Sequence, residues 1–347
     1  MAGTKKTSDA KAGTKKVRDN KASENKANMS KAKMNNNKGK AAKADVSKME
    51  NGKTDFDFKA SEYYTNRELS WILFDHRVLN EARDKSNPLF ERLKFLSITA
   101  SNLDEFFMIR VASLKDMVNA GYEKADISGM TPKQQLAALD TAIHELVNLQ
   151  YSTYNRSLFP ALAQNGLTIL KSHEQLTKEE GKFIDQYFEE NVYPVLTPMA
   201  VDSSRPFPLI RNKTLNIGAM VRGKDSDDEL EFATVQVPGV LSRVVELPER
   251  DGMRRVIFLE EIIERNINKL FLNYDIICAH PFRIMRNADL TIEEDEAEDL
   301  LKEIEKQIKM RQWGEAIRLE VEAGTDKRLL QFLEKELSLE DDSIYSI

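Results

Sequence analysis

The stretch that decides the fold lies at residues 63–118 and reads YYTNRELSWILFDHRVLNEARDKSNPLFERLKFLSITASNLDEFFMIRVASLKDMV. Its hydrophobic spacing and start signals predict three helices. Thr65 followed by Glu68 has the form of a capping box, so the first helix is expected to begin there. Trp71, Phe74 and Val78 then recur at helical spacing and predict its buried face.

The second and third helices have their own start signals. Asn87-Pro88 predicts a start because asparagine is a good N-cap and proline at the first helical position loses no amide donor. Ser101-Asn102 predicts the third start. The apolar face of the second helix is expected at Leu89, Leu93 and Leu96, and that of the third at Leu103, Phe106, Phe107, Val111, Leu114 and Val118.

Asn102 is the candidate binding residue of this stretch. A helix N-terminus exposes unpaired amides and a positive dipole end, which suit an anion or a polar ligand edge. The Asn102 side chain offers both an acceptor and a donor, as the edge of a heteroaromatic ring requires. The alternative is that Asn102 only caps its own helix, and the sequence alone favours that alternative.

A resemblance changes the balance between these two roles. The matching residues are Arg67-Glu68-Leu69-Ser70-Trp71, Phe74, Arg77-Val78-Leu79, Glu81-Ala82, Ser86-Asn87-Pro88-Leu89, Glu91-Arg92, Phe95-Leu96 and Ser101-Asn102-Leu103-Asp104-Glu105-Phe106. This run resembles the N-terminal domain of bacterial polyphosphate kinase of the type that forms long chains. The resemblance implies that Asn102 contacts ATP, which another part of the enzyme would bind for the most part.

The remainder of the chain predicts an α+β protein. Thr131-Pro132 starts a long helix, so residues 61–161 are expected to form an all-α helical bundle. Residues 162–347 are expected to form a mixed α/β head domain with a partly antiparallel sheet. Strands are predicted at 166–170, 214–221, 231–237, 243–247, 255–258, 275–285 and 316–321, an extended segment at 192–198, and helices from 177, at 260–270, 293–309 and 326–337.

Two later segments extend the resemblance to about residue 347. The first consists of residues 194–202 and 205–210, the second of residues 282–290, 294–301 and 318–321, and both are similar to the head (middle) domain of the same family. Arg205, Arg211 and Lys213 lie near a proline-rich loop and could meet phosphates, although a solvated loop is the simpler interpretation. The carboxylates of residues 293–299 spread around a predicted helix, which indicates a solvated face more than a cation site.

Composition separates a basic tail from an acidic body. Residues 1–60 hold 16 Lys and Arg against 7 Asp and Glu, while the other 287 residues hold 35 against 50. The tail has too little apolar surface to order, so it is predicted to be disordered. Its lysines could hold a polyanion, but the plainer interpretation is a solvated extension, and without interleaved aromatics it indicates no nucleic-acid binding.

The number of cysteines and the length of the apolar runs indicate the cellular compartment of the protein. Cys278 is the single cysteine, so a reducing compartment is expected and Cys278 is interpreted as a small core residue. No apolar run approaches the ~18 residues of a membrane span and no secretory signal is recognised, so a cytoplasmic protein is predicted, one that could still associate peripherally with a membrane.

Phosphotransfer residues are not recognised in the sequence. There is no GxxxxGK[ST] motif, and His76, His144, His173 and His280 share no motif with metal-ligand spacing, so no catalytic residue and no metal ligand is predicted. The resemblance implies that the phosphate-accepting histidine and the ligands of Mg²⁺ lie in phospholipase-D-like domains expected beyond Ile347.

The resemblance implies a definite role for this chain. The whole enzyme would be a transferase, a kinase that moves the terminal phosphate of ATP reversibly onto polyphosphate through a phosphohistidine, leaving ADP. This half would supply an adenine-side contact at Asn102 and surfaces for a homodimer or homotetramer, and would be inactive alone. The alternative is a catalytically inactive, stand-alone binding or assembly protein with a polyanion-binding tail.

Overall fold

A computed structural model describes residues 57–201, 206–224, 230–249, 252–289 and 314–347. The chain divides into two compact units, Met1–Ala60 and Ser61–Ile347, and the second unit holds the fold described here. The predicted disorder of the tail, the helix and acidic cluster predicted within 293–309, and Arg205 lie outside the described residues.

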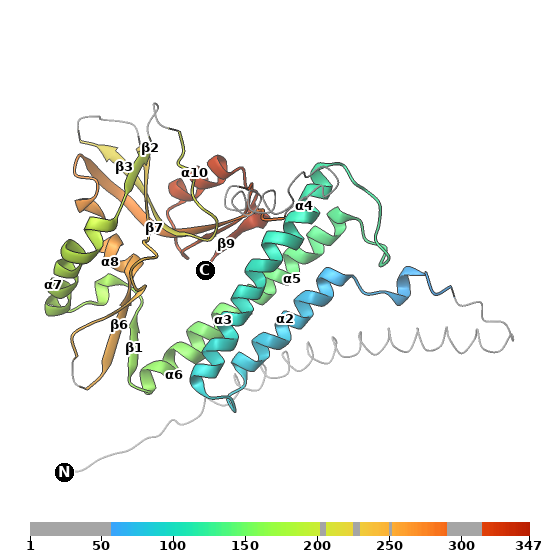
Figure 1. The fold of residues 1–347 in the computed structure, drawn as a ribbon, viewed down its shortest axis with the longest axis horizontal. Helices are drawn as coiled ribbons and strands as arrows, with labels where there is room; N and C mark the ends of the chain where they lie inside the picture. The colour runs from blue at the N-terminus through green and yellow to red at the C-terminus, as the bar shows by residue number, and fades with distance from the viewer. Residues whose placement is uncertain (1–56, 202–205, 225–229, 250–251, 290–313) are drawn as a thin grey trace, which may run out of the picture. The chain divides into compact units, whose positions relative to one another are not determined.

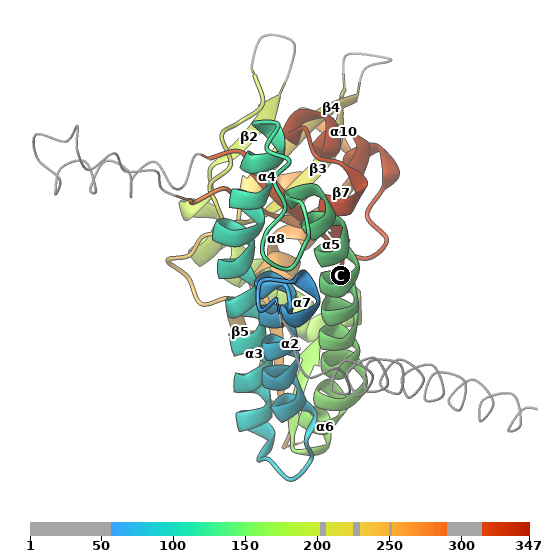
Figure 2. The same ribbon diagram turned by 90° about the vertical axis from the view of Figure 1, so that its right-hand side faces the viewer.

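The first half of the second unit is helical. Its helices are α2 (Arg67–Arg83), α3 (Leu89–Phe106), α4 (Ala112–Asn119), α5 (Pro132–Thr153) and α6 (Phe159–Gln164), after a 3-10 turn at Ser61–Tyr63. Single π turns at Phe107–Val111 and Tyr154–Leu158 join α3 to α4 and α5 to α6. The long helices α2, α3 and α5 lie side by side (Figures 1 and 2), as the predicted helical bundle requires.

The predicted start and buried face of the first helix were each displaced by one residue. Asn66, not Thr65, caps α2, because its side chain accepts the N–H groups of Glu68 and Leu69 at 3.1 and 3.0 Å. The buried face includes Ile72, Asp75 and Leu79, whereas half of Phe74 is exposed. Successive residues of an α-helix are 100° apart around its axis, so a displacement of one residue indicates a different face. The face that is in fact buried was missed because it includes an aspartate, which hydrophobic spacing does not report.

The predicted helix start at Ser101-Asn102 was wrong. Helix α3 runs without a break from Leu89 to Phe106, so Asn102 lies in its last turns and caps nothing. The Thr99 hydroxyl donates to the Phe95 carbonyl at 3.0 Å within this continuous helix. The unpaired amides expected around Asn102 are therefore absent, since backbone N–H groups inside a helix bond to the preceding turn.

The second predicted start is displaced by one residue and its expected cap does not form. Pro88, not Asn87, is the N-cap of α3, and no side chain caps that end. The Asn87 side chain instead donates to the Glu81 carbonyl at 3.0 Å. The predicted inward face of the third segment is confirmed, with Leu103, Phe106, Phe107, Val111 and Leu114 buried and Val118 half-buried.

The second half contains two sheets. The three-stranded sheet has the order β1-β6-β5, with β1 (Leu167–Leu170), β5 (Val244–Glu246) and β6 (Arg254–Phe258). The six-stranded sheet has the order β2-β4-β3-β7-β8-β9, with β2 (Pro198–Val201), β3 (Leu215–Gly223), β4 (Leu230–Gln236), β7 (Tyr274–Arg286), β8 (Ala316–Val321) and β9 (Ile344–Ser346). The pairs β1–β6 and β8–β9 are parallel and all others antiparallel, which confirms the predicted α+β class.

Helices cover these sheets. They are α7 (Lys178–Tyr187), α8 (Leu259–Arg265) and α10 (Lys327–Leu337). Capping boxes at Thr131 and Thr177 begin α5 and α7 as predicted. The predicted extended segment 192–198 was mostly wrong, because a π turn at Phe188–Val192 and a 3-10 turn at Tyr193–Val195 precede β2. Further 3-10 turns lie at His173–Gln175, Ile267–Lys269 and Asp341–Ser343.

The hydrophobic core has three parts. One lies among α7, α8, the small sheet and a face of the large sheet, and a second packs α10 against the large sheet. The third belongs to the helices but also includes Met285 of β7, Ile317 of β8 and Tyr345 of β9. The helices and the large sheet therefore share buried surface, and the boundaries 61–161 and 162–347 stay a prediction.

Candidate functional site

Asn102 is held by a buried carboxylate. Its side-chain Nδ2 donates to Oδ1 of Asp75 on α2 at 3.0 Å. Asp75 is fully buried, and its other oxygen, Oδ2, has no hydrogen-bond partner among the described residues. Burial raises the pKa of Asp75 to about 6, although the Asn102 hydrogen bond acts in the opposite direction.

This contact fixes the orientation of the Asn102 amide. An ionised carboxylate only accepts hydrogen bonds, so the NH₂ group of Asn102 must face Asp75 and its Oδ1 must face away. Within the described residues the Asn102 side chain makes no other hydrogen bond. Its carbonyl oxygen and its second amide hydrogen therefore remain available, and together they can meet a neighbouring donor and acceptor on a planar ligand edge.

An aromatic pair lies one helical turn from the polar pair. Trp71 of α2 stacks on Phe106 of α3 with ring centroids 4.3 Å apart and an interplanar angle of 14°. Trp71 precedes Asp75 by four residues and Phe106 follows Asn102 by four, so the two pairs occupy successive turns of the same helix contact. The stacked rings thus hold α2 and α3 in the register that the Asp75–Asn102 hydrogen bond needs.

Asp104, two residues after Asn102, faces the large sheet instead. Its two oxygens accept from Arg283 of β7 at 3.0 and 2.8 Å, and Lys213 approaches Oδ2 at 3.1 Å. Burial alone would raise the pKa of Asp104, but Arg283 and Lys213 hold it below its usual value. Arg283 also pairs with Glu320 of β8, so this ion network fixes α3 to the sheet.

Arg211 and Lys213, which the sequence places in a solvated loop with phosphate contact as the alternative, do not form a common site in the described part of the chain. Lys213 is engaged with Asp104, Arg211 is exposed, and Arg205 is outside the described residues. Both interpretations stay predictions.

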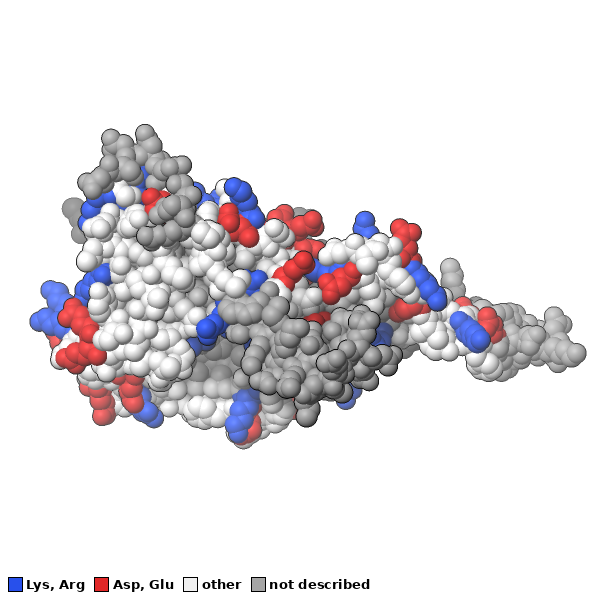
Figure 3. Space-filling view, turned by 45° about the horizontal axis from the view of Figure 1, so that its top comes forward, with Lys and Arg blue, Asp and Glu red and all other residues white. Residues whose placement is uncertain are grey.

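A cavity of about 790 Å³ lies between α5 and the sheets. Ala100 of α3 and Tyr151 of α5 line it, but Asn102 does not. Its basic residues already face carboxylates, since Arg243 binds Glu260 at 3.0 and 3.1 Å and Arg283 and Lys213 bind Asp104. Because these cations are neutralised, the cavity is not a ready cradle for phosphates. On the face in Figure 3, basic and acidic side chains of the described surface are interspersed.

The four histidines have different surroundings. His76 is half-buried on α2. His144 stacks on Tyr345 with ring centroids 4.2 Å apart, and its Nδ1 lies 3.0 Å from an Asp140 carboxylate oxygen. His173 and His280 lie on either side of Glu264, which no sequence spacing indicated because more than a hundred residues separate them. Cys278 is half-buried on β7 and packs against the core under α10.

Comparisons with known families match both halves. The model of the polyphosphate kinase N-terminal domain matches residues 64–170, and that of the polyphosphate kinase middle domain matches residues 179–347. This chain belongs to the polyphosphate kinase family. The matched ranges include Asn102 and Asp75 in the N-terminal domain and Glu264 in the middle domain.

Relatives show how much of such a protein this chain represents. It is 47% identical to the polyphosphate kinase of Halalkalibacterium halodurans over 297 residues, which cover 85% of this chain and 42% of the relative. It is 44% identical to that of Synechocystis over 300 residues, 84% of this chain and 41% of the relative. The chain thus spans about two fifths of the length of these relatives.

A solved structure agrees on the fold. The crystal structure of polyphosphate kinase from Porphyromonas gingivalis matches with a TM-score of 0.65 at 24% identity, over 81% of this chain and 39% of that chain. The helical domain followed by an α/β head is therefore the architecture of a known relative. No helix in the described ranges has both the length and the apolar content to cross a membrane.

Proposed function

We propose that this chain is the nucleotide-contacting part of a polyphosphate kinase and that Asn102 reads the adenine edge of ATP. The observation that supports the proposal is the Asp75–Asn102 hydrogen bond, which points the Asn102 oxygen away from α2. Adenine presents an amino donor next to a ring-nitrogen acceptor. An asparagine with one free carbonyl oxygen and one free amide hydrogen matches that pair of groups.

In the whole enzyme, the terminal phosphate of ATP would pass reversibly to polyphosphate through a phosphohistidine outside this chain. Residues 1–347 would orient the base, and the phosphates would be bound elsewhere. The groups of described side chains able to hold a metal each contain a histidine, whereas Mg²⁺ prefers oxygen ligands and water. These groups do not fit Mg²⁺, and no step is assigned to it here.

The protein would also self-associate in the cytoplasm as a homodimer or homotetramer. Leu73 and Phe74 of α2 and Phe90 and Ile98 of α3 are large apolar side chains that are 45–62% exposed. Such exposed apolar surface commonly marks an interface. It lies on the two helices that carry Asp75 and Asn102, so assembly and nucleotide binding would involve the same helix pair.

A chimaeric enzyme tests the proposal. Residues 1–347 replace the matching region of the Halalkalibacterium halodurans polyphosphate kinase, and polyphosphate synthesis is measured against ATP concentration. Asn102→Ala is expected to raise KM for ATP about tenfold, because a lost base contact is worth about 1.4 kcal/mol or more. KM for polyphosphate is expected to stay unchanged.

The matched control is Asn148→Ala. Asn148 is an exposed asparagine within α5 whose side chain makes no hydrogen bond among the described residues, so it controls for the change in helix propensity. An unchanged KM for ATP in Asn102→Ala, or an equal rise in both variants, would refute the proposed role of Asn102.

A further inference from the structure

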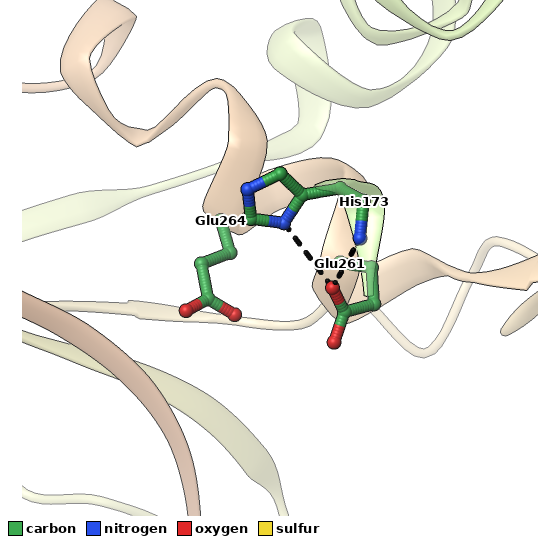
Figure 4. Close-up of side chains that lie close together, drawn as sticks. All are labelled: His173, Glu261 and Glu264. Atoms are coloured by element: carbon green, nitrogen blue, oxygen red, sulfur yellow. Dashed lines mark hydrogen bonds and ion pairs between the residues drawn. The ribbon is translucent and has the colours of Figure 1, made fainter. Parts of the chain in front are cut away.

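The first part of an unassigned side-chain cluster is built on the small sheet. His173 follows β1 in the 3-10 turn His173–Gln175. Its backbone N–H donates to Oε2 of Glu261 on α8 at 2.9 Å, and its ring Nδ1 lies 3.2 Å from the same oxygen (Figure 4). Two contacts to one carboxylate oxygen fix both the main chain and the ring of His173.

The second part is built on the large sheet. His280 lies in β7, and its Nδ1 is 3.1 Å from Oε2 of Glu322, which follows β8. The side chains of His280 and Glu322 are 23% and 41% exposed, and that of His173 is 26% exposed. Both histidine–glutamate pairs are therefore ordered by the fold yet open to a small ion.

Glu264 of α8 joins the two pairs. One ligand atom each from His173, Glu261 and Glu264 lie within 4.8 Å of one another, and the same holds for Glu264, His280 and Glu322. Within the described residues, the Glu264 side chain makes no hydrogen bond and no ion pair, although its backbone carbonyl accepts from the Asn266 N–H.

No lysine or arginine among the described residues pairs with the Glu264 carboxyl group. Two three-residue groups share Glu264, one with His173 and Glu261 and the other with His280 and Glu322, and in each group the histidine is turned toward a carboxylate. Imidazole nitrogen together with carboxylate oxygen is a ligand set that suits Zn²⁺ and similar divalent transition metals better than Mg²⁺. Neighbouring glutamate carboxylates repel one another, and a bound cation would attract each of them and so offset that repulsion.

We propose that Glu264 is the centre of a divalent transition-metal site of the Zn²⁺ class, completed by the pairs His173–Glu261 and His280–Glu322. Such a site is independent of the nucleotide contact at Asn102 on α3. An ion held by Glu264, His173 and Glu261 links the segment after β1 to α8, and an ion held by Glu264, His280 and Glu322 links α8 to the large sheet. Metal binding should therefore stabilise the middle domain.

The test uses the full 347-residue chain after treatment with EDTA and dialysis. Zn²⁺ is titrated by calorimetry, and thermal unfolding is recorded with and without the ion. The unaltered chain is expected to bind with a dissociation constant of about a micromolar or below and to melt at a higher temperature with Zn²⁺. Co²⁺, used as a spectroscopic probe in place of Zn²⁺, is expected to show visible absorption once nitrogen and oxygen ligands of the site bind it.

Glu264→Gln is the decisive variant, because it keeps the shape of the side chain while removing the ligand charge. It is expected to weaken Zn²⁺ binding at least about tenfold and to lose both the thermal shift and the Co²⁺ absorption. Without metal it should unfold no more easily than the unaltered chain, since it removes a half-buried carboxyl group that lies near other glutamates. If Glu264→Gln does not fold, His173→Gln is the second variant, with the same expected losses.

His76→Gln is the control, because His76 lies on α2 outside the cluster and should leave metal binding unchanged. Equal Zn²⁺ affinity in the unaltered chain, Glu264→Gln and His173→Gln would overturn the proposal and mean that Zn²⁺ binds elsewhere on the surface. Absence of any thermal shift or Co²⁺ absorption in the unaltered chain would also overturn it.

Discussion

At the scale of single residues, the buried Asp75 gives Asn102 its orientation. The Asp75 carboxylate is fully buried and leaves Oδ2 without a partner among the described residues, so it is a costly group in the folded chain. The folded state keeps this group where it can hold the Asn102 amide. We infer that Asp75 is a positioning residue for the nucleotide contact.

The pKa of Asp75 sets a pH dependence of stability. It is about 6 in the fold against an ordinary value of 3.8, so the folded state binds more protons than the unfolded state between these pH values. Stability from this group is therefore full below about pH 4 and is lost as pH rises through about 6. Asp75→Asn removes the titration and is expected to stabilise the fold near neutral pH by about 1–3 kcal/mol.

Urea unfolding of the chain and of Asp75→Asn, at about pH 4 and about pH 7, measures this effect. The stabilisation should shrink at the lower pH, where Asp75 is protonated in the folded state and about half protonated in the unfolded state. In the chimaera, Asp75→Asn should also raise KM for ATP, because a neutral partner lets the Asn102 amide turn over. A gain in stability that is the same at both pH values would show that the charge of Asp75 is not its cause.

The sequence identified Asn102 as a candidate binding residue but did not identify Asp75, its hydrogen-bond partner. The Asn-Leu-Asp-Glu-Phe segment carried the resemblance, whereas an aspartate inside a helix gives no sign that it is buried. The spacing of Trp71, Phe74 and Val78 indicated a face one residue away from the true one, since apolar side chains of α2 occupy both faces. Half-exposed Phe74 belongs to apolar surface, not to the core.

At the scale of elements, the ion network around Asp104 attaches α3 to the large sheet. Asp104→Asn leaves Arg283 and Lys213 without this carboxylate and should destabilise the fold by about 3 kcal/mol. Denaturant unfolding measures the loss. Glu105→Gln is the matched control, because Glu105 is the exposed neighbour on α3 and makes no ion pair among the described residues.

The pH response of Asp104 has the opposite sign to that of Asp75. Its pKa is held below the ordinary value, so its stabilisation is present above that ordinary value and is lost as pH falls through the lowered pKa. The difference in the free energy of unfolding between the unaltered chain and Asp104→Asn should therefore become smaller at acidic pH. A loss of stability no larger than that of Glu105→Gln would contradict the structural role of the network.

Long elements with clear periodicity or caps were predictable, and local irregularities were not. Strand β8 has the predicted bounds, and α5, α7 and α10 begin within one residue of the predicted starts at Thr131, Thr177 and Asp326. The false start at Ser101-Asn102 arose because a capping sequence can also lie within a helix that tertiary packing keeps continuous. The short strands β2 and β9 depend on pairing with distant strands, which periodicity does not report.

At the scale of the whole molecule, the unit Ser61–Ile347 carries the described core. All three hydrophobic clusters among the described residues lie within it. A chain that starts at Ser61 is therefore expected to unfold within about 1 °C of the full chain in a calorimetric scan. A markedly lower melting temperature would show that residues 1–60 contribute to stability.

The sequence predicted some features of the whole molecule and missed others. The family and the α+β architecture followed from dense local matches, whereas the cluster around Glu264 depends on contacts between residues far apart in sequence and could not be predicted. No histidine was predicted to be catalytic, and we propose that the chemistry lies in the part of the enzyme that this chain does not include.

The most direct test is incorporation of labelled terminal phosphate from ATP into polyphosphate. It is measured for residues 1–347 alone and for the chimaera in which they replace the matching region of the Halalkalibacterium halodurans enzyme. We expect no polymer from the chain alone and ATP-dependent polymer from the chimaera. Polymer formation by residues 1–347 alone would contradict the account, because the phosphate-accepting group would then lie within this chain.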